Sequence, residues 1–308
     1  IRLGDRKQLR AEMAGDVQGL TTRRGRLVTN STSYNNYFDT DDIDGALACM
    51  DKHGYCVIRQ MIDQSLVDEL KVSIDDVLDP DRDLPEASNR YHMMLAEACP
   101  SLWKLVQHPQ YLNYVQKVHG TADLCLHRSA AILRTPGEQM GRWHTDHRGH
   151  IDPPKGPNDV LNRFNLPSGS WFYLNGSHPD RSGIAVIEDS HLPTWPGPEG
   201  FELTPDRSTF HRIGEAEDAG CNDMDVPGCV AVEADPGDLI CFAALTYHTN
   251  METHERRYSC GIGFRPKSIR IAAPWPLPQS ALDMIEGLPA HLRKYADGYT
   301  SFDREWKP

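Results

Sequence analysis

Three side chains in this sequence match the ligand set of a mononuclear iron site. His144 and Asp146 stand two positions apart, and His248 lies far downstream. In a strand, residues i and i+2 point to the same face, so His144 and Asp146 could bind one metal ion while Thr145 points away. His248 must then come from a neighbouring strand. Two histidines and one carboxylate on one face of Fe(II) leave the opposite positions open for a co-substrate and oxygen.

The His-x-Asp pattern occurs twice more in the chain. Asp152, two residues after His150, runs directly into two prolines, which cannot sit inside a paired strand. His178 and Asp180 stand in a run of turn-forming residues. The chain has 14 histidines and 44 acidic residues, so a triplet alone is weak evidence. Context therefore favours the copy at His144.

A candidate carboxylate-binding arginine follows the second histidine. Residues 234–242 predict a tight turn that leads into an apolar strand, and His248 comes shortly after it. Residues 256–264 predict another apolar strand with a basic start. An arginine there could bind a dicarboxylate through two parallel hydrogen bonds. Taken alone, Arg257 is better explained by a surface charge at a strand end.

These motifs, in their order along the chain, resemble the phytanoyl-CoA dioxygenase (PhyH-like) family of Fe(II)/2-oxoglutarate oxygenases. The matching segments are residues 51–59, 135–137, 143–146, 170–174, 183–191 and 237–242, then His248 and residues 257–259. The resemblance spans about residues 40 to 270. Two departures stand out: the family usually has Pro-Gly where this chain has Glu188-Asp189, and the interval between the histidine and the arginine is slightly short.

The resemblance implies that His144, Asp146 and His248 hold Fe(II). It also implies that 2-oxoglutarate chelates this iron, and that reaction with O2 releases succinate and CO2. The retained carboxylate of Asp146 favours oxygenation, because related halogenases replace it with a small residue.

The resemblance further implies that Arg257 binds the distal carboxylate of 2-oxoglutarate and that Trp171 lies beside it. The short interval leaves Arg256 as a rival. We prefer Arg257 because Ser259 then lies two residues on, on the same strand face. Arg134, before the predicted Pro-Gly turn, is the next candidate.

The substrate is expected to be a small molecule. His147, Arg148 and His150 follow the iron-binding segment, and with Arg142 they form a positive cluster on an acidic chain. Such a cluster would suit a carboxylate, an amino acid or a phosphonate, although a solvated loop explains it equally well. Tyr173 could line the pocket or belong to the core.

Other functions stay open at this point. The same iron centre could catalyse hydroxylation, desaturation, epimerisation or ring closure. Two histidines and a carboxylate can also bind zinc in a hydrolase. A noncatalytic jelly-roll binding protein is the third class, but it would have no use for a complete ligand set and a co-substrate arginine.

The elements that must position these residues indicate an α+β fold, mainly β with flanking helices. Residues 1–40 predict a polar arm that lies on the domain or on a partner subunit, which would make a homo-oligomer. Residues 41–308 form one expected domain: a helical part (41–120), a β core (121–270) and C-terminal helices (271–308). Helices are expected from about Asp41, over 63–78 and over 90–120.

The short strands and Gly/Pro turns of the β core are typical of a sandwich or jelly roll. The resemblance implies the double-stranded β-helix, or cupin-like, form. The connections 147–170 and 192–228 are long for a compact domain, and such loops are usually functional or disordered. Aromatic residues within 192–228 favour an ordered lid.

Composition excludes several function classes. The net charge of −12 argues against nonspecific nucleic-acid binding, which needs a basic surface. No apolar run approaches the ~18 residues of a membrane span. The eight cysteines form no C-x-x-C pair, and no signal peptide is evident. We therefore expect a cytoplasmic enzyme with free thiols, although the missing initiator Met leaves a removed targeting segment open.

Overall fold

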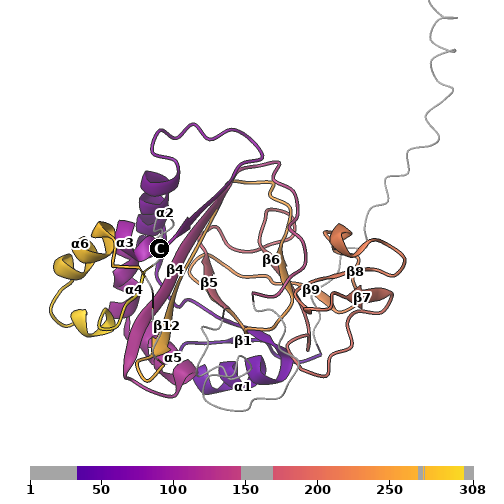
Figure 1. Cartoon of the computed structure of the whole chain (residues 1–308), viewed down its shortest axis with the longest axis horizontal. Coiled ribbons are helices and arrows are strands. Elements are labelled where there is room, and N and C mark those ends of the chain that lie inside the picture. Colours follow the sequence, from indigo (N-terminus) through magenta and orange to yellow (C-terminus); the bar gives the residue numbers. More distant parts are fainter. Residues whose placement is uncertain (1–32, 147–168, 270–272, 274, 302–308) are drawn as a thin grey trace, which may run out of the picture.

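Two β-sheets that face each other form the centre of this computed structural model (Figure 1), which describes residues 33–146, 169–269, 273 and 275–301. The larger sheet has the strand order β1-β2-β10-β5-β12-β4-β3, and the smaller has the order β11-β6-β9. A separate two-stranded ribbon, β7-β8, lies beyond the smaller sheet.

The strands and helices have the following bounds. The larger sheet consists of β1 (Tyr37–Phe38), β2 (Tyr55–Ile58), β3 (Asn89–Met93), β4 (Leu124–Arg134), β5 (Gly169–Tyr173), β10 (Leu239–Phe242) and β12 (Arg257–Pro266). The smaller sheet consists of β6 (Ile184–Ile187), β9 (Cys229–Ala231) and β11 (His248–Asn250), and the ribbon of β7 (Phe201–Leu203) and β8 (Phe210–Arg212). The α-helices are α1 (Ile43–His53), α2 (Gln64–Leu78), α3 (Leu95–Ala98), α4 (Trp103–Gln107), α5 (Pro109–His119) and α6 (Gln279–Gly287). Three short 3₁₀ turns cover Pro100–Leu102, Glu217–Ala219 and Arg293–Tyr295.

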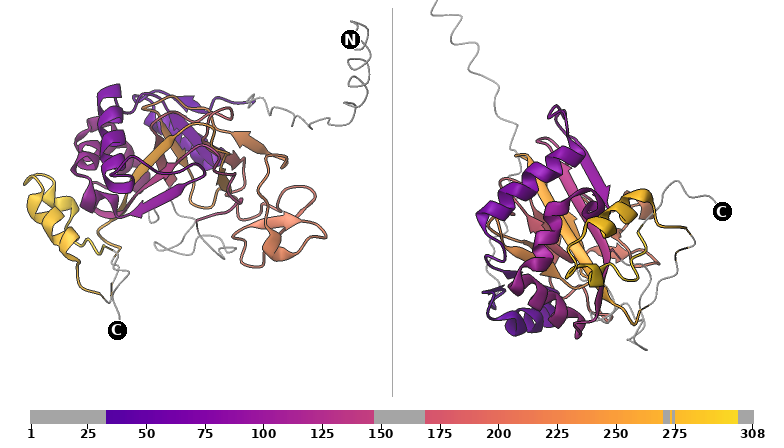
Figure 2. Two further views of the ribbon diagram at one scale, coloured as in Figure 1. Left: turned by 90° about the horizontal axis from the view of Figure 1, so that it is seen from above. Right: turned by 90° about the vertical axis from the view of Figure 1, so that its left-hand side faces the viewer.

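The helices cover one face of the larger sheet, and the smaller sheet covers the other (Figures 1 and 2). Capping side chains fix where the first two helices begin. Asp42 accepts a hydrogen bond from the Gly45 amide at 3.0 Å, and Asp63 accepts one from the Leu66 amide at 2.8 Å. Both helices lie where the sequence predicts them.

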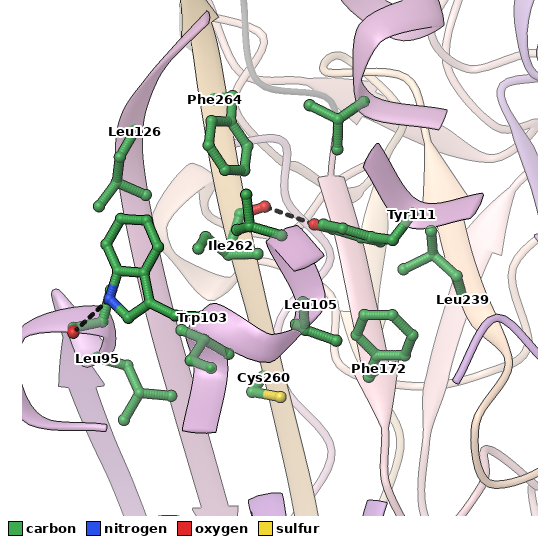
Figure 3. Packing of buried hydrophobic residues seen from close by; sticks show 14 of the residues in the cluster. Leu95, Trp103, Leu105, Tyr111, Leu126, Phe172, Leu239, Cys260, Ile262 and Phe264 are labelled. Carbon is green, nitrogen blue, oxygen red and sulfur yellow. Dashed lines mark hydrogen bonds between the residues drawn. The ribbon is translucent and has the colours of Figure 1, made fainter. Parts of the chain in front are cut away.

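Strand alternation divides the side chains of the larger sheet between two cores. Even-numbered residues of β12, such as Cys260, Ile262 and Phe264, face the helices and pack with Trp103 and Tyr111 (Figure 3). The two aromatic residues bury their rings and satisfy their polar atoms: Trp103 donates to the Ala96 carbonyl at 3.1 Å and Tyr111 to the Ile262 carbonyl at 2.8 Å. The odd-numbered residues of β12 therefore point into the space between the sheets.

A second core fills the space between the two sheets. Val57 and Ile240 of the larger sheet pack there against Ile184 and Val186 of the smaller sheet. This arrangement agrees with the predicted double-stranded β-helix. The helices contain about as many residues as the strands, so the fold is α+β rather than predominantly β.

A third core orders the long connection 192–228. Phe201 and Phe210 are buried there with Trp143, and the Trp195 ring lies 5.0 Å from the Tyr247 ring. The expectation of an ordered segment anchored by aromatic residues is confirmed. The other long connection lies largely outside the described residues.

Two expectations about the N-terminal half need correction. Residues 90–120 are not helical throughout, because Asn89–Met93 pair with β4 as the edge strand β3. The expected arm, residues 1–40, lies mostly outside the described residues, but Tyr37–Phe38 belong to the larger sheet, where they pair in parallel with β2. The C-terminal helices are confirmed by α6 and the turn at Arg293–Tyr295.

At Glu188-Asp189, where the resembled family usually has Pro-Gly, the second residue has a backbone conformation that suits glycine. Asp189 has a φ of 57°, in the left-handed region that Asp tolerates better than most residues. Its amide donates to the His53 carbonyl at 3.2 Å, so the turn forms without the Pro-Gly pair.

All eight cysteines are buried and free, in agreement with the expected reduced thiols. Among the described helices, none has the length and apolar character that crossing a membrane would require.

Candidate metal and co-substrate site

His144 and His248 meet because their backbones pair at the edge of the smaller sheet. The His144 amide donates to the His248 carbonyl at 3.1 Å, and the His248 amide donates to the His144 carbonyl at 2.9 Å. His144 thus pairs with His248 of β11 through a single antiparallel β-bridge and does not belong to a regular strand. The two rings lie 4.5 Å apart.

The side chains of residues 143–146 point alternately to two sides, as in a strand, although this segment is not a regular strand. Trp143 and Thr145 are buried on one side, where their amides donate to the carbonyls of Cys221 and Ser208. His144 and Asp146 therefore share the opposite side, as the sequence predicts.

Hydrogen bonds fix the orientation of both imidazole rings. The Nδ1 atom of His144 lies 2.8 Å from the Arg142 carbonyl, and that of His248 lies 3.0 Å from the Thr246 carbonyl. A carbonyl oxygen only accepts, so each Nδ1 donates to it, and Nε2 is the ring atom that could bind a metal. Backbone carbonyls commonly orient metal-binding histidines in this way.

The carboxylate completes a group that could hold a metal ion. Potential ligand atoms of His144, Asp146 and His248 all lie within 4.8 Å of one another, and no other such group of three occurs among the described residues. Asp146 Oδ1 is 3.9 Å from His248 Nε2. Donor type and spacing fit the 2-His-1-carboxylate set. His178 and Asp180 lie in a turn, and His150 and Asp152 are outside the described residues.

Arg257, the first residue of β12, is buried between the sheets with a guanidinium that is only partly satisfied. Its Nη1 donates to Asn250 Oδ1 at 2.8 Å, and its Cζ lies 5.1 Å from the centre of the Tyr173 ring. Within the described part of the chain, its Nε and Nη2 have no hydrogen-bond partner. Burial lowers the pKa of Arg257 to about 10, which still leaves it charged at neutral pH.

Ser259 and Tyr173 lie on the same face as Arg257. Ser259 is fully buried, and its hydroxyl likewise has no partner among the residues that the structure describes. Tyr173, which pairs with Ser259 across the strands, donates to Asn250 at 3.2 Å. Buried donors without partners are costly, so this group fits an anionic ligand that would accept from them.

Arg256 directly precedes β12, and its side chain points to the face of the sheet opposite to that of Arg257. Its guanidinium donates to Asp75 and to Asp79 of the α2 end, each at 2.6 Å, and to the hydroxyl of Tyr258 at 2.7 Å. Arg256 therefore belongs to the contact between sheet and helix and lies away from the space between the sheets.

Arg134 lies opposite Arg257 in the neighbouring strand β4, but it is occupied. It donates to the carboxylate of Glu138 at 3.0 Å and to the carbonyls of Gln139 and Met251. Among the described residues, Arg134 keeps one buried donor without a partner, its Nε, whereas Arg257 keeps two, its Nε and Nη2, and so has more donors left for a ligand.

A cavity of 220 Å³ opens beside Asp146. Trp171, half-buried on β5, lines it; Tyr173 lies deeper, beside Arg257. Of the expected substrate residues, Arg142 supports His144 through its carbonyl, while its side chain lies against Gly220 and does not line this cavity. His147, Arg148 and His150 lie outside the described residues.

Sequence reasoning missed Asn250, which joins Arg257 to Tyr173. The available signal was its position: Asn250 stands two residues after His248 on β11 and so shares the face of that histidine.

Comparison with known proteins agrees with this geometry. The family model described as phytanoyl-CoA dioxygenase (PhyH) matches residues 50–252. Similar solved structures include SnoN, a non-heme α-ketoglutarate-dependent epimerase from nogalamycin biosynthesis (19% identity, TM-score 0.53, covering 77% of this chain and 92% of that one). SnoK, a carbocyclase of the same kind from the same biosynthesis, has 17% identity and a TM-score of 0.50, covering 73% and 85%. HygX from Streptomyces hygroscopicus, solved with nickel and 2-oxoglutarate bound, has 17% identity and a TM-score of 0.52, covering 72% and 86%. No curated protein sequence matches the chain. At these identities, the structures share the fold alone.

Proposed function

Because the chain belongs to the phytanoyl-CoA dioxygenase (PhyH) family, we propose that it is an Fe(II)/2-oxoglutarate-dependent oxygenase that acts on a small molecule. His144, Asp146 and His248 would hold the iron. The convergence of these three side chains carries the proposal. Both imidazoles would bind the metal through Nε2, because Nδ1 of each ring lies at hydrogen-bond distance from a backbone carbonyl.

The partly satisfied Arg257 supports the co-substrate assignment. A carboxylate oxygen could accept from its Nε and Nη2 and from the hydroxyl of Ser259, which lack acceptors among the described residues. Asn250 and Tyr173 hold the guanidinium in place. A zinc hydrolase or a binding module would leave this buried cation without a role.

When bound, iron and 2-oxoglutarate supply the oxidation of a C–H bond by O2, with succinate and CO2 as co-products. The residues of this chain orient the reactants and keep water away. His248 is buried and its ring lies 4.6 Å from that of Phe242, which shields the inner side of the site. Asp146 is exposed at the cavity, where a substrate can approach.

We propose hydroxylation of an unactivated C–H bond as the reaction. Epimerisation and ring closure on the same centre are the second candidate, because an epimerase and a carbocyclase share this fold; desaturation belongs with them. Mass analysis of the product separates these outcomes, since hydroxylation adds an oxygen atom and the others do not.

The experiment that tests the proposal compares two histidine–aspartate pairs. His144→Ala should lose Fe(II) binding and 2-oxoglutarate-dependent succinate formation, because one of three protein ligands is removed. Asp180→Ala removes an exposed carboxylate from the other described His-x-Asp copy and should retain both. Iron content after gel filtration and succinate yield are the readouts. Wild-type iron content and turnover in purified His144→Ala protein would overturn the assignment.

A further inference from the structure

The cavity beside Asp146 is formed by side chains that face the space between the sheets. Its walls include Trp171 of β5, Tyr91 and Met93 of β3, and Arg128 of β4. The strand register supports a shared face, because Met93 pairs with Ala130, two residues from Arg128. One end of the cavity is the candidate iron ligand Asp146, so a molecule in the cavity would lie next to the metal.

Glycines form the part of the cavity wall opposite β4. Gly263 is the pairing partner of Arg128, and Gly261 is the partner of Ala130. A Cβ atom at Gly261 would lie 2.6 Å from the Ser170 carbonyl, closer than packing permits. The missing side chains let β5 approach β12 and leave space in front of Arg128.

Arg128 is a cation that has no partner among the described residues. It is exposed, and it forms no hydrogen bond or ion pair within the part of the chain that the structure describes. This distinguishes it from Arg134, which is bound to Glu138, and from Arg256, which is bound to Asp75 and Asp79. Asp146 is the acidic residue among those that line the cavity, and a bound metal ion would neutralise it. The charge left to attract a ligand is therefore positive.

We infer that Arg128 binds a carboxylate of the substrate and thereby sets its specificity, an inference that rests on the proposed function. The aromatic rings of Trp171 and Tyr91 suit an apolar, preferably aromatic, body of the same molecule. The planar guanidinium of Arg128 can bind the carboxylate through two parallel hydrogen bonds. The predicted substrate class is a small aromatic carboxylic acid. The carbon to be oxidised would lie on the side of the ring that faces the iron.

The test compares acids with neutral amides of the same shape. Benzoate, phenylacetate and 3-phenylpropanoate, with their primary amides, are titrated into Fe(II)-loaded protein without oxygen and with saturating 2-oxoglutarate. Calorimetry gives the affinities. Wild type should bind at least one acid about tenfold more tightly than its amide, because a charge-assisted hydrogen bond is lost in the amide. Arg128→Gln should abolish this preference and leave amide binding nearly unchanged.

Arg90→Gln is the matched control. Arg90 is also an exposed arginine, next to Tyr91 on β3, but it pairs with Leu133 and so lies on the opposite sheet face. This variant should keep the preference for acids. Equal affinity for acids and amides in wild type, an acid preference that survives Arg128→Gln, or no binding by any of the six compounds would overturn the inference. The binding assay needs no turnover, so these outcomes are separate from a failure of the wild-type protein to bind Fe(II) and 2-oxoglutarate, which would refute the proposed function itself.

Discussion

A buried arginine with unused donors is an unusual residue unless a ligand completes it. Arg257 is 1% exposed, and its close acceptors within the described part of the chain are Asn250 and, at 3.4 Å, the Gly183 carbonyl. A buried charge without full hydrogen bonding is destabilising. An anion that binds there would recover part of this cost, so a residue of the larger sheet could contribute to the same site as metal ligands at the edge of the smaller sheet.

Replacement of this residue should weaken co-substrate binding specifically. A charge-assisted, hydrogen-bonded pair contributes roughly 1.5–3 kcal/mol. Arg257→Ala should therefore raise the 2-oxoglutarate dissociation constant by about one to two orders of magnitude, with iron affinity little changed. Arg257→Lys should restore only part of the affinity, because an ammonium group lacks the planar pair of donors. Titrations of 2-oxoglutarate at saturating Fe(II), without oxygen, measure both effects.

Arg256→Ala is the control, because Arg256 directly precedes β12 and its side chain contacts Asp75 and Asp79 on the helix-covered face of the sheet. It should leave the 2-oxoglutarate affinity near wild type. If Arg256→Ala caused the large loss and Arg257→Ala did not, the assignment of faces along β12 would be wrong. If neither variant lost affinity, the dicarboxylate would have to bind elsewhere.

For single residues, the alternation of side chains along a strand made most of the proposed site predictable from the sequence. The i, i+2 rule places His144 with Asp146 and Arg257 with Ser259. It could not show that Arg134 is already engaged, because that depends on how Glu138 folds back after a turn. Arg128 was missed for a similar reason, since its importance comes from the cavity and from no motif.

Among the elements, the pairing of β5 with β12 depends on a glycine. Gly261 follows directly after the last paired residues, Cys260 and Phe172. Gly261→Ala should destabilise the protein by about 1–3 kcal/mol, because its new methyl group would meet the Ser170 carbonyl, which is backbone and cannot easily move. Urea unfolding of the purified variant gives the change in free energy.

Gly287→Ala provides the comparison for this effect. Gly287 is the exposed last residue of α6, with nothing within 4 Å of a Cβ atom. This change should be neutral or stabilise the protein by up to about 1 kcal/mol through lower unfolded-state entropy. Equal stability of the two variants would contradict the importance of the close approach at Gly261.

The end of α2 is attached to β12 by an acid-sensitive contact. Burial alone would raise the pKa of Asp79, but hydrogen bonds from Arg256 and from the amides of Asp83 and Leu84 outweigh it and lower the pKa below 3.8. A lowered carboxylate pKa contributes stability above the unfolded value, and this contribution is lost as pH falls through the folded value. Arg256→Ala should therefore be less stable than wild type at neutral pH, and the difference should shrink below about pH 4.

Urea midpoints of both proteins from about pH 7 to about pH 3 measure this dependence. Arg82→Ala is a suitable control, because Arg82 is a neighbouring arginine whose side chain is 42% exposed and pairs with the exposed Asp76 at 2.6 Å. Its effect should be small, as is usual for surface ion pairs. A difference between wild type and Arg256→Ala that grows on acidification would contradict the argument.

Elements with strong local signals were predictable, and those defined by distant pairing were not. Helices α1 and α2 begin at Asp caps and bury an apolar face, so their positions follow from the sequence. Strand β3 is short, polar and largely exposed, and it exists because β4 provides hydrogen-bond partners for it. Its sequence alone lacks the apolar alternation that identifies a strand.

Over the whole molecule, the two halves of the proposed site come from different sheets. The metal ligands lie at the edge of the smaller sheet, with His144 bridged to β11. The residues assigned to 2-oxoglutarate, Arg257 and Ser259, lie on β12 of the larger sheet. Asn250 of β11 contacts Arg257 and so spans the gap between the sheets. A co-substrate that binds both the iron and Arg257 would connect the sheets in the same way.

This arrangement predicts that metal and co-substrate stabilise the fold cooperatively. With Fe(II) present and oxygen excluded, 2-oxoglutarate at ~100 times its dissociation constant should raise the free energy of unfolding by about 2.7 kcal/mol. The same concentration without metal should add much less, because only the Arg257 end would be held. Linkage requires the reciprocal effect, so 2-oxoglutarate should increase the affinity for Fe(II) by the same factor.

Two variants test this coupling. In His144→Ala, Fe(II) and 2-oxoglutarate should no longer influence each other's binding. In Arg257→Ala, the stabilisation by 2-oxoglutarate should fall, while Fe(II) alone still stabilises the fold. Urea unfolding of the three proteins, with each ligand alone and with both, gives the complete cycle. Equal stabilisation by 2-oxoglutarate with and without Fe(II) would show that the dicarboxylate does not join the two sheets through the iron.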